Sequence, residues 1–180
     1  MPQIYLHFKI LNMQIDLPDR IERARAEWAD EEPGLDTSPM EVIGRVLRAA
    51  HLADAHIRRV LRRESLDRGG FDVLATLRRT GPPYQLTPTA LYQELVLTSG
   101  AMTHRVDALA RAGLVERVSG PADRRSNLVG LTARGKSVVD RAMAAHMHCE
   151  AAMIAPLPEE DRQALAVLLK KLLSGIEEKA

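Results

Sequence analysis

The chain has little cysteine and few aromatic rings. Its 180 residues contain a single cysteine, Cys149, and aromatic residues make up only 3% of the sequence. A single cysteine excludes a disulfide within the chain and is typical of a reducing compartment, so we expect a cytoplasmic protein. The scarcity of aromatic residues disfavours a β-sandwich, whereas 46% hydrophobic residues can build an alanine- and leucine-rich core of packed helices.

The sequence also lacks a membrane-spanning run and the motifs of common enzymes. No apolar run approaches the roughly 20 residues that a helix needs to cross a bilayer. The apolar segment 1–13 has neither a basic start nor a small-residue cleavage site, which argues against a signal peptide; an edge strand and translation from Met13 both stay open. There is no glycine-rich phosphate loop, nucleophile elbow or paired-carboxylate motif. We therefore expect neither an enzyme nor a cofactor.

Charge is distributed unevenly along the chain, although its net charge is only +1. Residues 98–136 carry seven cations against three anions, a net charge of +4. Residues 1–40 carry four cations against eight anions, a net charge of −4. A local basic patch in a near-neutral chain is typical of a DNA-binding regulator, and it argues against a protein that coats nucleic acid everywhere.

Apolar periodicity predicts a mainly helical fold. The run Ser38-Pro39-Met40-Glu41 matches a capping box with proline at the first helical position, and a long core helix follows it. The glycine pair at 69–70 interrupts the pattern after this helix. The expected helices cover residues 18–30, 39–63, 71–79, 87–96, 98–112, 132–154 and 159–176.

Residues 113–135, GLVERVSGPADRRSNLVGLTARG, predict a basic β-hairpin. Two apolar strand cores flank a tight loop that carries Asp123, Arg124 and Arg125 at its tip. Guanidinium groups on the tip of a two-stranded hairpin suit the narrow, negative minor groove of DNA. The alternative is a charged hairpin that lies in solvent.

The helices expected at 87–96 and 98–112 match a helix-turn-helix, whose second helix enters the major groove by its N-terminal end. Hydroxyl groups on the first turns of that helix can bind phosphate or base edges, and an arginine there can pair with guanine through two hydrogen bonds. The alternative is an ordinary amphipathic surface helix. The candidate DNA-contacting residues on these turns are Ser99, Thr103, His104 and Arg105.

This order of helices and basic hairpin resembles the MarR family of winged helix-turn-helix transcription regulators. The matching sequence is TSGAMTHRVDALARA before the hairpin, the Asp-x-Arg tip at 123–125, and Leu-Thr-x-x-Gly at 131–135. The resemblance covers about residues 38–175 and implies a mainly α fold with a small β-hairpin wing. It implies that Arg125 enters the minor groove while Asp123 braces the wing arginine. It also implies a homodimer on a pseudo-palindromic operator in double-stranded DNA.

The resemblance divides the chain into three regions. Residues 1–37 form an extension with an extra helix, residues 38–64 and 140–180 form a helical dimerisation region, and residues 65–139 form the winged helix-turn-helix. An apolar stripe in the last helix independently indicates a surface that packs against a partner chain. Packing within one chain is the alternative. The stripe consists of Leu165, Leu168, Leu169, Leu172, Leu173 and Ile176.

The region before the helix-turn-helix is similar to the urate-responsive branch of the same family, which has an extra N-terminal helix. The similarity lies in Trp28 with the acidic stretch after it, in SPMEVIGRVLRAAHL, and in FDVLATLRRTGPPYQLTP. It implies an effector site formed by Trp28, Asp72, Arg105 and Arg117. An aromatic wall and forked cationic donors suit a planar anion, and an Asp72–Arg105 pair would link the pocket to the DNA-reading helix.

Each of these four residues also has a structural interpretation. Trp28 can simply attach an amphipathic helix to the core, and Asp72 can be a helix N-terminal charge. Arg105 can be a phosphate contact, and Arg117 an exposed strand residue. The segment before Asp16 is not expected in that branch.

The favoured function is a repressor that a small aromatic anion such as urate releases from operator DNA. The alternatives are a regulator of the same fold that senses phenolic compounds or oxidants, and a DNA-binding protein without a ligand. Oxidant sensing would use Cys149, but Glu150 beside it disfavours a thiolate. His146 shares a helix face with these two residues while His148 points elsewhere, which leaves half a metal site, so we expect no metal.

Overall fold

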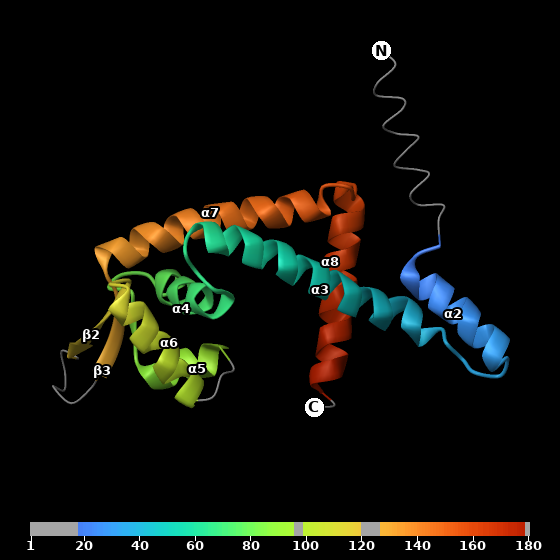
Figure 1. Cartoon of the computed structure of the whole chain (residues 1–180), viewed down its shortest axis with the longest axis horizontal. Coiled ribbons are helices and arrows are strands. Elements are labelled where there is room, and N and C mark those ends of the chain that lie inside the picture. The colour runs from blue at the N-terminus through green and yellow to red at the C-terminus, as the bar shows by residue number, and fades with distance from the viewer. Residues whose placement is uncertain (1–17, 96–98, 120–126, 179–180) are drawn as a thin grey trace, which may run out of the picture. The chain divides into compact units, whose positions relative to one another are not determined.

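A computed structural model of the protein describes residues 18–95, 99–119 and 127–178. The chain divides into two compact units, Met1–Leu52 and Ala53–Ala180, and helix α3 (Pro39–Arg63) runs from one into the other. Figure 1 labels the helices and strands of both units. Within the described ranges, no helix is long and apolar enough to cross a membrane.

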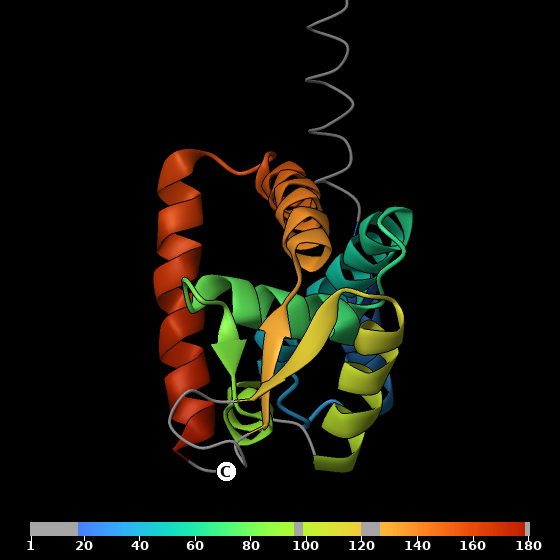
Figure 2. The ribbon, with the colours of Figure 1, turned by 90° about the vertical axis from the view of Figure 1, so that its left-hand side faces the viewer.

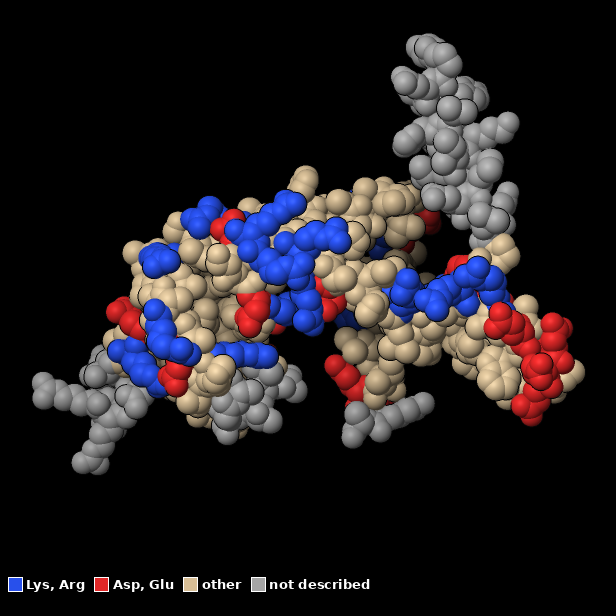
Figure 3. Space-filling view, in the orientation of Figure 1, with Lys and Arg blue, Asp and Glu red and all other residues tan. Residues whose placement is uncertain are grey.

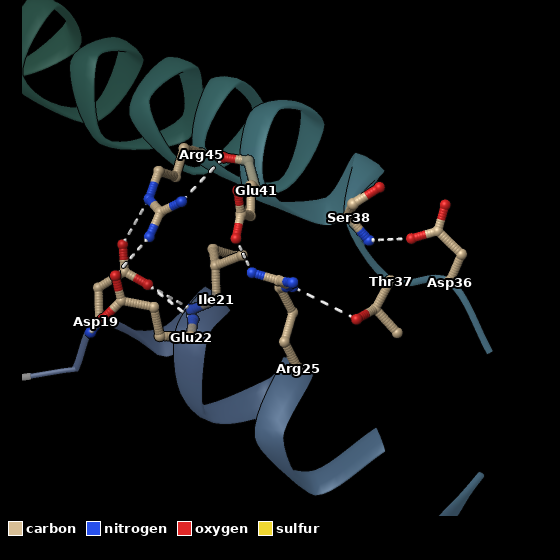
Figure 4. A network of polar contacts seen from close by, with 9 residues as sticks. All are labelled: Asp19, Ile21, Glu22, Arg25, Asp36, Thr37, Ser38, Glu41 and Arg45. Carbon is tan, nitrogen blue, oxygen red and sulfur yellow. Dashed lines mark hydrogen bonds and ion pairs between the residues drawn. The ribbon is translucent and has the colours of Figure 1, made fainter. Parts of the chain in front are cut away.

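Polar contacts join the two helices of the first unit. Helix α2 (Arg20–Glu31) begins at a capping box: the Asp19 carboxylate accepts hydrogen bonds from the N–H groups of Ile21 and Glu22, and Glu22 accepts one from the Asp19 N–H. Arg45 of α3 lies 2.7 Å from Asp19 Oδ2 and 2.9 Å from Glu22 Oε1 (Figure 4). The hydrogen bond from the Glu22 backbone, with that from Arg45, holds the pKa of Asp19 below its ordinary value.

The start of α3 differs from the predicted capping box. Ser38 donates its N–H to Asp36 at 2.9 Å, and Glu41 forms an ion pair with Arg25 of α2 (Figure 4). Asp36 therefore accepts the bond that a capping box assigns to Glu41. The sequence pattern could not show this, because the partner of Glu41 lies on another helix.

Helix α4 (Arg68–Arg79) begins three residues earlier than periodicity predicts. Gly69 and Gly70 lie in its first turn instead of interrupting the chain. The Asp67 carboxylate caps this turn by accepting a hydrogen bond from the Gly70 N–H at 2.6 Å. A good N-cap thus starts the helix in spite of two residues with low helix propensity.

The second unit continues with two short helices and a small sheet. Helices α5 (Pro88–Leu95) and α6 (Ser99–Arg111) pack against α4 and against each other. Strands β1 (Gln85–Leu86), β2 (Val115–Ser119) and β3 (Asn127–Leu131) form an antiparallel sheet in the order β1-β3-β2 (Figure 2). The predicted hairpin corresponds to β2 and β3. Strand β1 was not predicted, since two residues carry too little pattern to identify.

A mainly aliphatic core lies among the end of α3, α4, α5, α6, the sheet and α7 (Ala133–Ile154). This confirms a mainly helical fold with a small β-hairpin wing. The largest fully buried side chains are Leu61, Leu74, Leu77, Leu91, Met102, Val73, Val106, Val129 and Val139.

Helix α8 (Glu159–Glu177) contributes nothing to this core. None of its residues is buried, and most of the predicted apolar stripe is between 41% and 61% exposed. The most exposed members are Leu168 and Leu173. The stripe is therefore an open apolar face of the chain, and packing within the monomer does not account for it.

Candidate nucleic-acid interface

Helices α5 and α6 form the helix-turn-helix. Thr87 caps α5, because its Oγ1 accepts a hydrogen bond from the Ala90 N–H at 3.1 Å. On α6, Met102 and Val106 are buried in the core, whereas Thr103 and His104 lie on the exposed side. The second helix of the pair therefore presents polar side chains outward, as a DNA-reading helix must.

Strands β2 and β3 form the stem of the wing. Arg117 of β2 lies opposite Val129 of β3, and its side chain is exposed. Four of the predicted DNA contacts lie outside what the structure describes: the side chain of Ser99, and the tip residues Asp123, Arg124 and Arg125. Their contacts with DNA remain predictions.

The base of the wing is tied to the ends of two helices. Thr132 Oγ1 donates a hydrogen bond to the Gly113 carbonyl at 2.8 Å and accepts one from the Gly135 N–H at 2.9 Å. Gly113, with φ of 68°, follows the last turn of α6 in the left-handed conformation that glycine allows. A Cβ at position 135 would overlap the carbonyl oxygen of Leu114, so α7 can begin here only with glycine. These contacts hold the end of α6, the base of the wing and the start of α7 together.

Arg105 lies against the first turn of α4. Its guanidinium covers Gly69, where any Cβ would overlap the guanidinium Cζ and Nε atoms. The predicted Asp72–Arg105 ion pair is wrong, because Asp72 Oδ1 pairs with Arg68 Nε at 3.3 Å and no ion pair in the described residues joins it to Arg105. Arg68 precedes Asp72 by one helical turn, so the two side chains are neighbours on the same face of α4.

A cavity of about 190 Å³ opens between α5, α6 and the wing stem. Arg117 extends into its lining, and its Nη2 donates a hydrogen bond to Asp107 Oδ1 at 2.7 Å. An anion that binds Arg117 here has to compete with Asp107, which belongs to α6. The lining residues are Pro88, Thr89, Tyr92, Met102, Thr103, Val106 and Arg117.

The four predicted effector residues lie in different parts of the chain. Trp28 is in α2 of the first unit, with 48% of its surface exposed. Asp72 is in α4 and Arg105 covers the start of that helix, whereas Arg117 lines the cavity. Sequence reasoning missed the apolar walls of this cavity, because a residue such as Tyr92 at helical spacing predicts only core packing.

The histidine- and cysteine-containing end of α7 takes part in packing. His146 is buried, its Nε2 lies 3.1 Å from Glu150 Oε1, and its ring lies against Phe71 with 5.0 Å between centroids. Cys149 is a partly buried free thiol. Over the described ranges, no three His, Cys, Asp or Glu side chains lie close enough together to hold a metal ion.

An ion-pair network on α7 was not predicted from the sequence. Asp140 lies 2.9 Å from Lys136 Nζ and 2.7 Å from Arg78 Nε of α4. Lys136 first, and then Arg78, hold the pKa of Asp140 below its ordinary value of 3.8. Arg78 also lies over the ring of Tyr84, 5.0 Å from its centroid. Only the Lys136–Asp140 spacing is visible in the sequence, since Arg78 comes from a distant helix.

Two comparisons with known proteins agree with this geometry. A model of the MarR family matches residues 66–126, which include α4, the helix-turn-helix and the first wing strand. The HTH-type transcriptional regulator PecS of Dickeya dadantii (strain 3937) is 35% identical over 146 residues, which cover 81% of this chain and 88% of PecS. The chain belongs to the MarR family. The predicted likeness to a urate-responsive branch is not part of this finding.

Solved MarR-family structures share the fold of this chain. A cysteine-to-serine variant of MarR from Escherichia coli, complexed with operator DNA, has a TM-score of 0.63 and 28% identity, and covers 74% of this chain and 96% of MarR. A MarR-family regulator from Streptomyces coelicolor in complex with DNA has a TM-score of 0.67 and 24% identity, and covers 78% and 89%. These likenesses confirm the winged helix-turn-helix.

Proposed function

We propose that this MarR-family protein is a transcriptional repressor that leaves its operator when it binds a small aromatic anion. The observation that carries the proposal is the outward polar side of α6 beside the stem of a basic wing. A helix of this kind suits the major groove, and a hairpin with arginines at its tip suits the minor groove. PecS and MarR, whose names and structures describe regulation and operator binding, support the same function.

The repressor acts as a homodimer on a pseudo-palindromic site. Its dimerisation region comprises residues 38–64 and 140–180, where large apolar side chains are exposed on α7 and α8. Several large exposed apolar side chains on the same helices are typical of an interface. Two identical winged regions related by a two-fold axis match two half-sites of a palindrome.

The effector is a planar anion such as urate, bound through Arg117 with Trp28, Asp72 and Arg105 as the further predicted contacts. Arg117 already holds a carboxylate, that of Asp107, at the wall of a cavity. A ligand anion that takes over Arg117 releases Asp107, which lies on the DNA-reading helix. Release of the operator follows if the ligand binds this rearranged state more tightly than the DNA-bound state.

A binding titration tests the proposal. Fluorescence anisotropy would follow the full chain with a labelled duplex from the region upstream of its gene and with a scrambled duplex, each with and without urate. We expect specific binding that urate weakens. Equal affinity for both duplexes would contradict the repressor function. Specific binding that urate does not change would contradict only the choice of urate as the effector.

Two variants make the effector test sharper. Arg117→Gln should retain specific DNA binding and lose the urate response. Arg111→Gln removes the same charge one turn beyond Asp107 on α6, outside the cavity lining, and should keep the response. Urate should also quench the fluorescence of Trp28, the only tryptophan.

The walls of the cavity favour a second effector class. Pro88, Tyr92 and Val106 surround Arg117 with apolar surface, which suits an aromatic carboxylate of the phenolic type. Salicylate in the same titration separates the two classes. Release of DNA by salicylate and not by urate would assign the regulator to phenolic compounds.

A further inference from the structure

A second cavity, near the last residue of α6 and away from its first turn, is lined by arginine and serine side chains. Its volume is about 440 Å³, within the range of small-molecule sites. It lies where the end of α3, the end of α6 and the first turns of α7 meet, and it is distinct from the cavity at Arg117. Its lining residues are Arg63, Glu64, Ser65, Ala112, Leu114, Arg134, Ser137, Val138 and Arg141.

The charges of this cavity are not balanced. Arg141 is compensated, because its guanidinium lies 3.1 Å from Glu64 Oε2 and it also donates to Ser137 Oγ at 3.1 Å. Arg63 and Arg134 have no hydrogen bond or ion pair with any residue that the structure describes. Two guanidinium groups are thus left over at one cavity, beside the hydroxyl groups of two serines.

Arg134 is at a position where a cation is electrostatically unfavourable. It is the second residue of α7, a 22-residue helix, and the first turn of this helix contains no acidic residue. The N-terminus of a helix carries partial positive charge and favours anions. Arg63 lies at the C-terminal end of α3, where the helix dipole favours a cation. Arg134 lies at the N-terminal end of α7, where the dipole disfavours one. An anion bound between them would compensate both the guanidinium groups and the helix end.

The side chains that line the cavity indicate which class of anion it binds. Forked guanidinium donors and hydroxyl donors match the several oxygens of a phosphoryl group. Leu114 and Val138 add a small apolar wall on which the organic part of a phosphate ester can lie. In Figure 3, basic side chains gather on the face over α7 and the end of α3, so an approaching anion meets a positive surface.

We propose that this cavity binds the phosphoryl group of a small molecule, held by Arg63 and Arg134 with help from Ser65 and Ser137. DNA is a poorer occupant. Ala112 lies about 14 Å along the helix from Thr103, at a rise of 1.5 Å per residue, so the cavity is at the far end of the DNA-reading helix. The inference concerns anion binding alone and does not depend on DNA binding.

Isothermal titration of the full chain without DNA, at fixed ionic strength in a phosphate-free buffer, tests the site with inorganic phosphate and phenyl phosphate as probes. We expect at least one of them to bind with a Kd of about 1 mM or tighter. Tighter binding of phenyl phosphate would identify a phosphate ester as the ligand, and equal binding would identify free phosphate.

Matched variants locate the binding. The double variant Arg63→Gln/Arg134→Gln should weaken it by about tenfold or more, because each guanidinium supplies charge-assisted hydrogen bonds. Arg59→Gln, on α3 but outside the lining, should bind as the wild type does, and Arg117→Gln tests the other cavity. Thermal melting of each variant checks that it is folded.

Several outcomes would overturn the inference. These are the absence of heat from both probes, undiminished binding by the double variant, equal loss in Arg59→Gln, and loss only in Arg117→Gln. If neither probe binds but the double variant loses operator affinity, the two arginines are DNA backbone contacts instead. These results leave the proposed repressor function untouched, because it is measured with DNA and urate.

Discussion

Helices α4 and α8 both carry large apolar side chains, yet they lie in opposite surroundings. Seven of the 12 residues of α4 are buried, whereas none of the 19 residues of α8 is. Removing apolar surface from water is worth about 25 cal/mol per Å², so α4 gains its stability inside the chain and α8 can gain it only against another surface. The winged region therefore buries its apolar side chains within one chain, whereas the apolar side chains of α8 stay exposed in the single chain.

The largest expected effect comes from a cavity in the winged region. Leu74 of α4 is fully buried. Leu74→Ala should lower the free energy of unfolding by about 2–5 kcal/mol, because the lost contacts leave a cavity that the core cannot fill. Urea denaturation followed by circular dichroism measures this loss. A change below about 0.5 kcal/mol, which is usual for surface positions, would contradict the burial of α4.

The matching change in α8 should act on assembly instead. Leu168 is 61% exposed. Leu168→Glu should dissociate the dimer, because the interface would have to bury a carboxylate without a partner, while the helical content of each chain is kept. Light scattering after size exclusion reports the mass, and circular dichroism the fold. Glu160→Gln on the same helix is a control outside the apolar stripe. A dimer that survives Leu168→Glu would show that α8 pairs through another face.

The comparison also shows what the sequence could and could not predict. Apolar periodicity was enough for α7 and α8, because the observed helices agree within one residue with those expected at 132–154 and 159–176. The start of α4 was missed, since the cap at Asp67 outweighs two glycines. Which apolar stripe is core and which is open cannot be read from one chain, because both have the same period.

At the candidate site, local patterns were predictable and side-chain partners were not. The inward and outward residues of α6 follow from helical spacing. The ion pair of Arg68 with Asp72 has the spacing of one helical turn, which is visible in the sequence. The ion pair of Arg117 with Asp107 joins a strand to a helix and depends on a distance across the fold that no spacing encodes. The cavity at Arg117 was missed for the same reason.

A smaller effect concerns the attachment of α4 to α7 and its dependence on pH. The pKa of Asp140 is lowered, so its ion pairs stabilise the fold above the ordinary value of 3.8, and this contribution is lost as the pH falls through the lowered pKa. Asp140→Asn should therefore be less stable than the wild type at pH 7, and the difference should shrink below about pH 4. Urea midpoints at stepwise lower pH measure it, with the exposed Glu116→Gln as the control. A difference that does not change with pH would contradict the network.

The salt dependence of operator binding tests most directly the claim that the second unit is a DNA-binding winged region. Arg125 is the residue predicted to enter the minor groove. The affinity of the wild type and of Arg125→Ala for the same duplex would be measured over a range of salt concentrations. We expect the variant to bind more weakly, and the slope of log affinity against log salt to fall by about one phosphate contact. Unchanged affinity and slope would contradict the role of the wing.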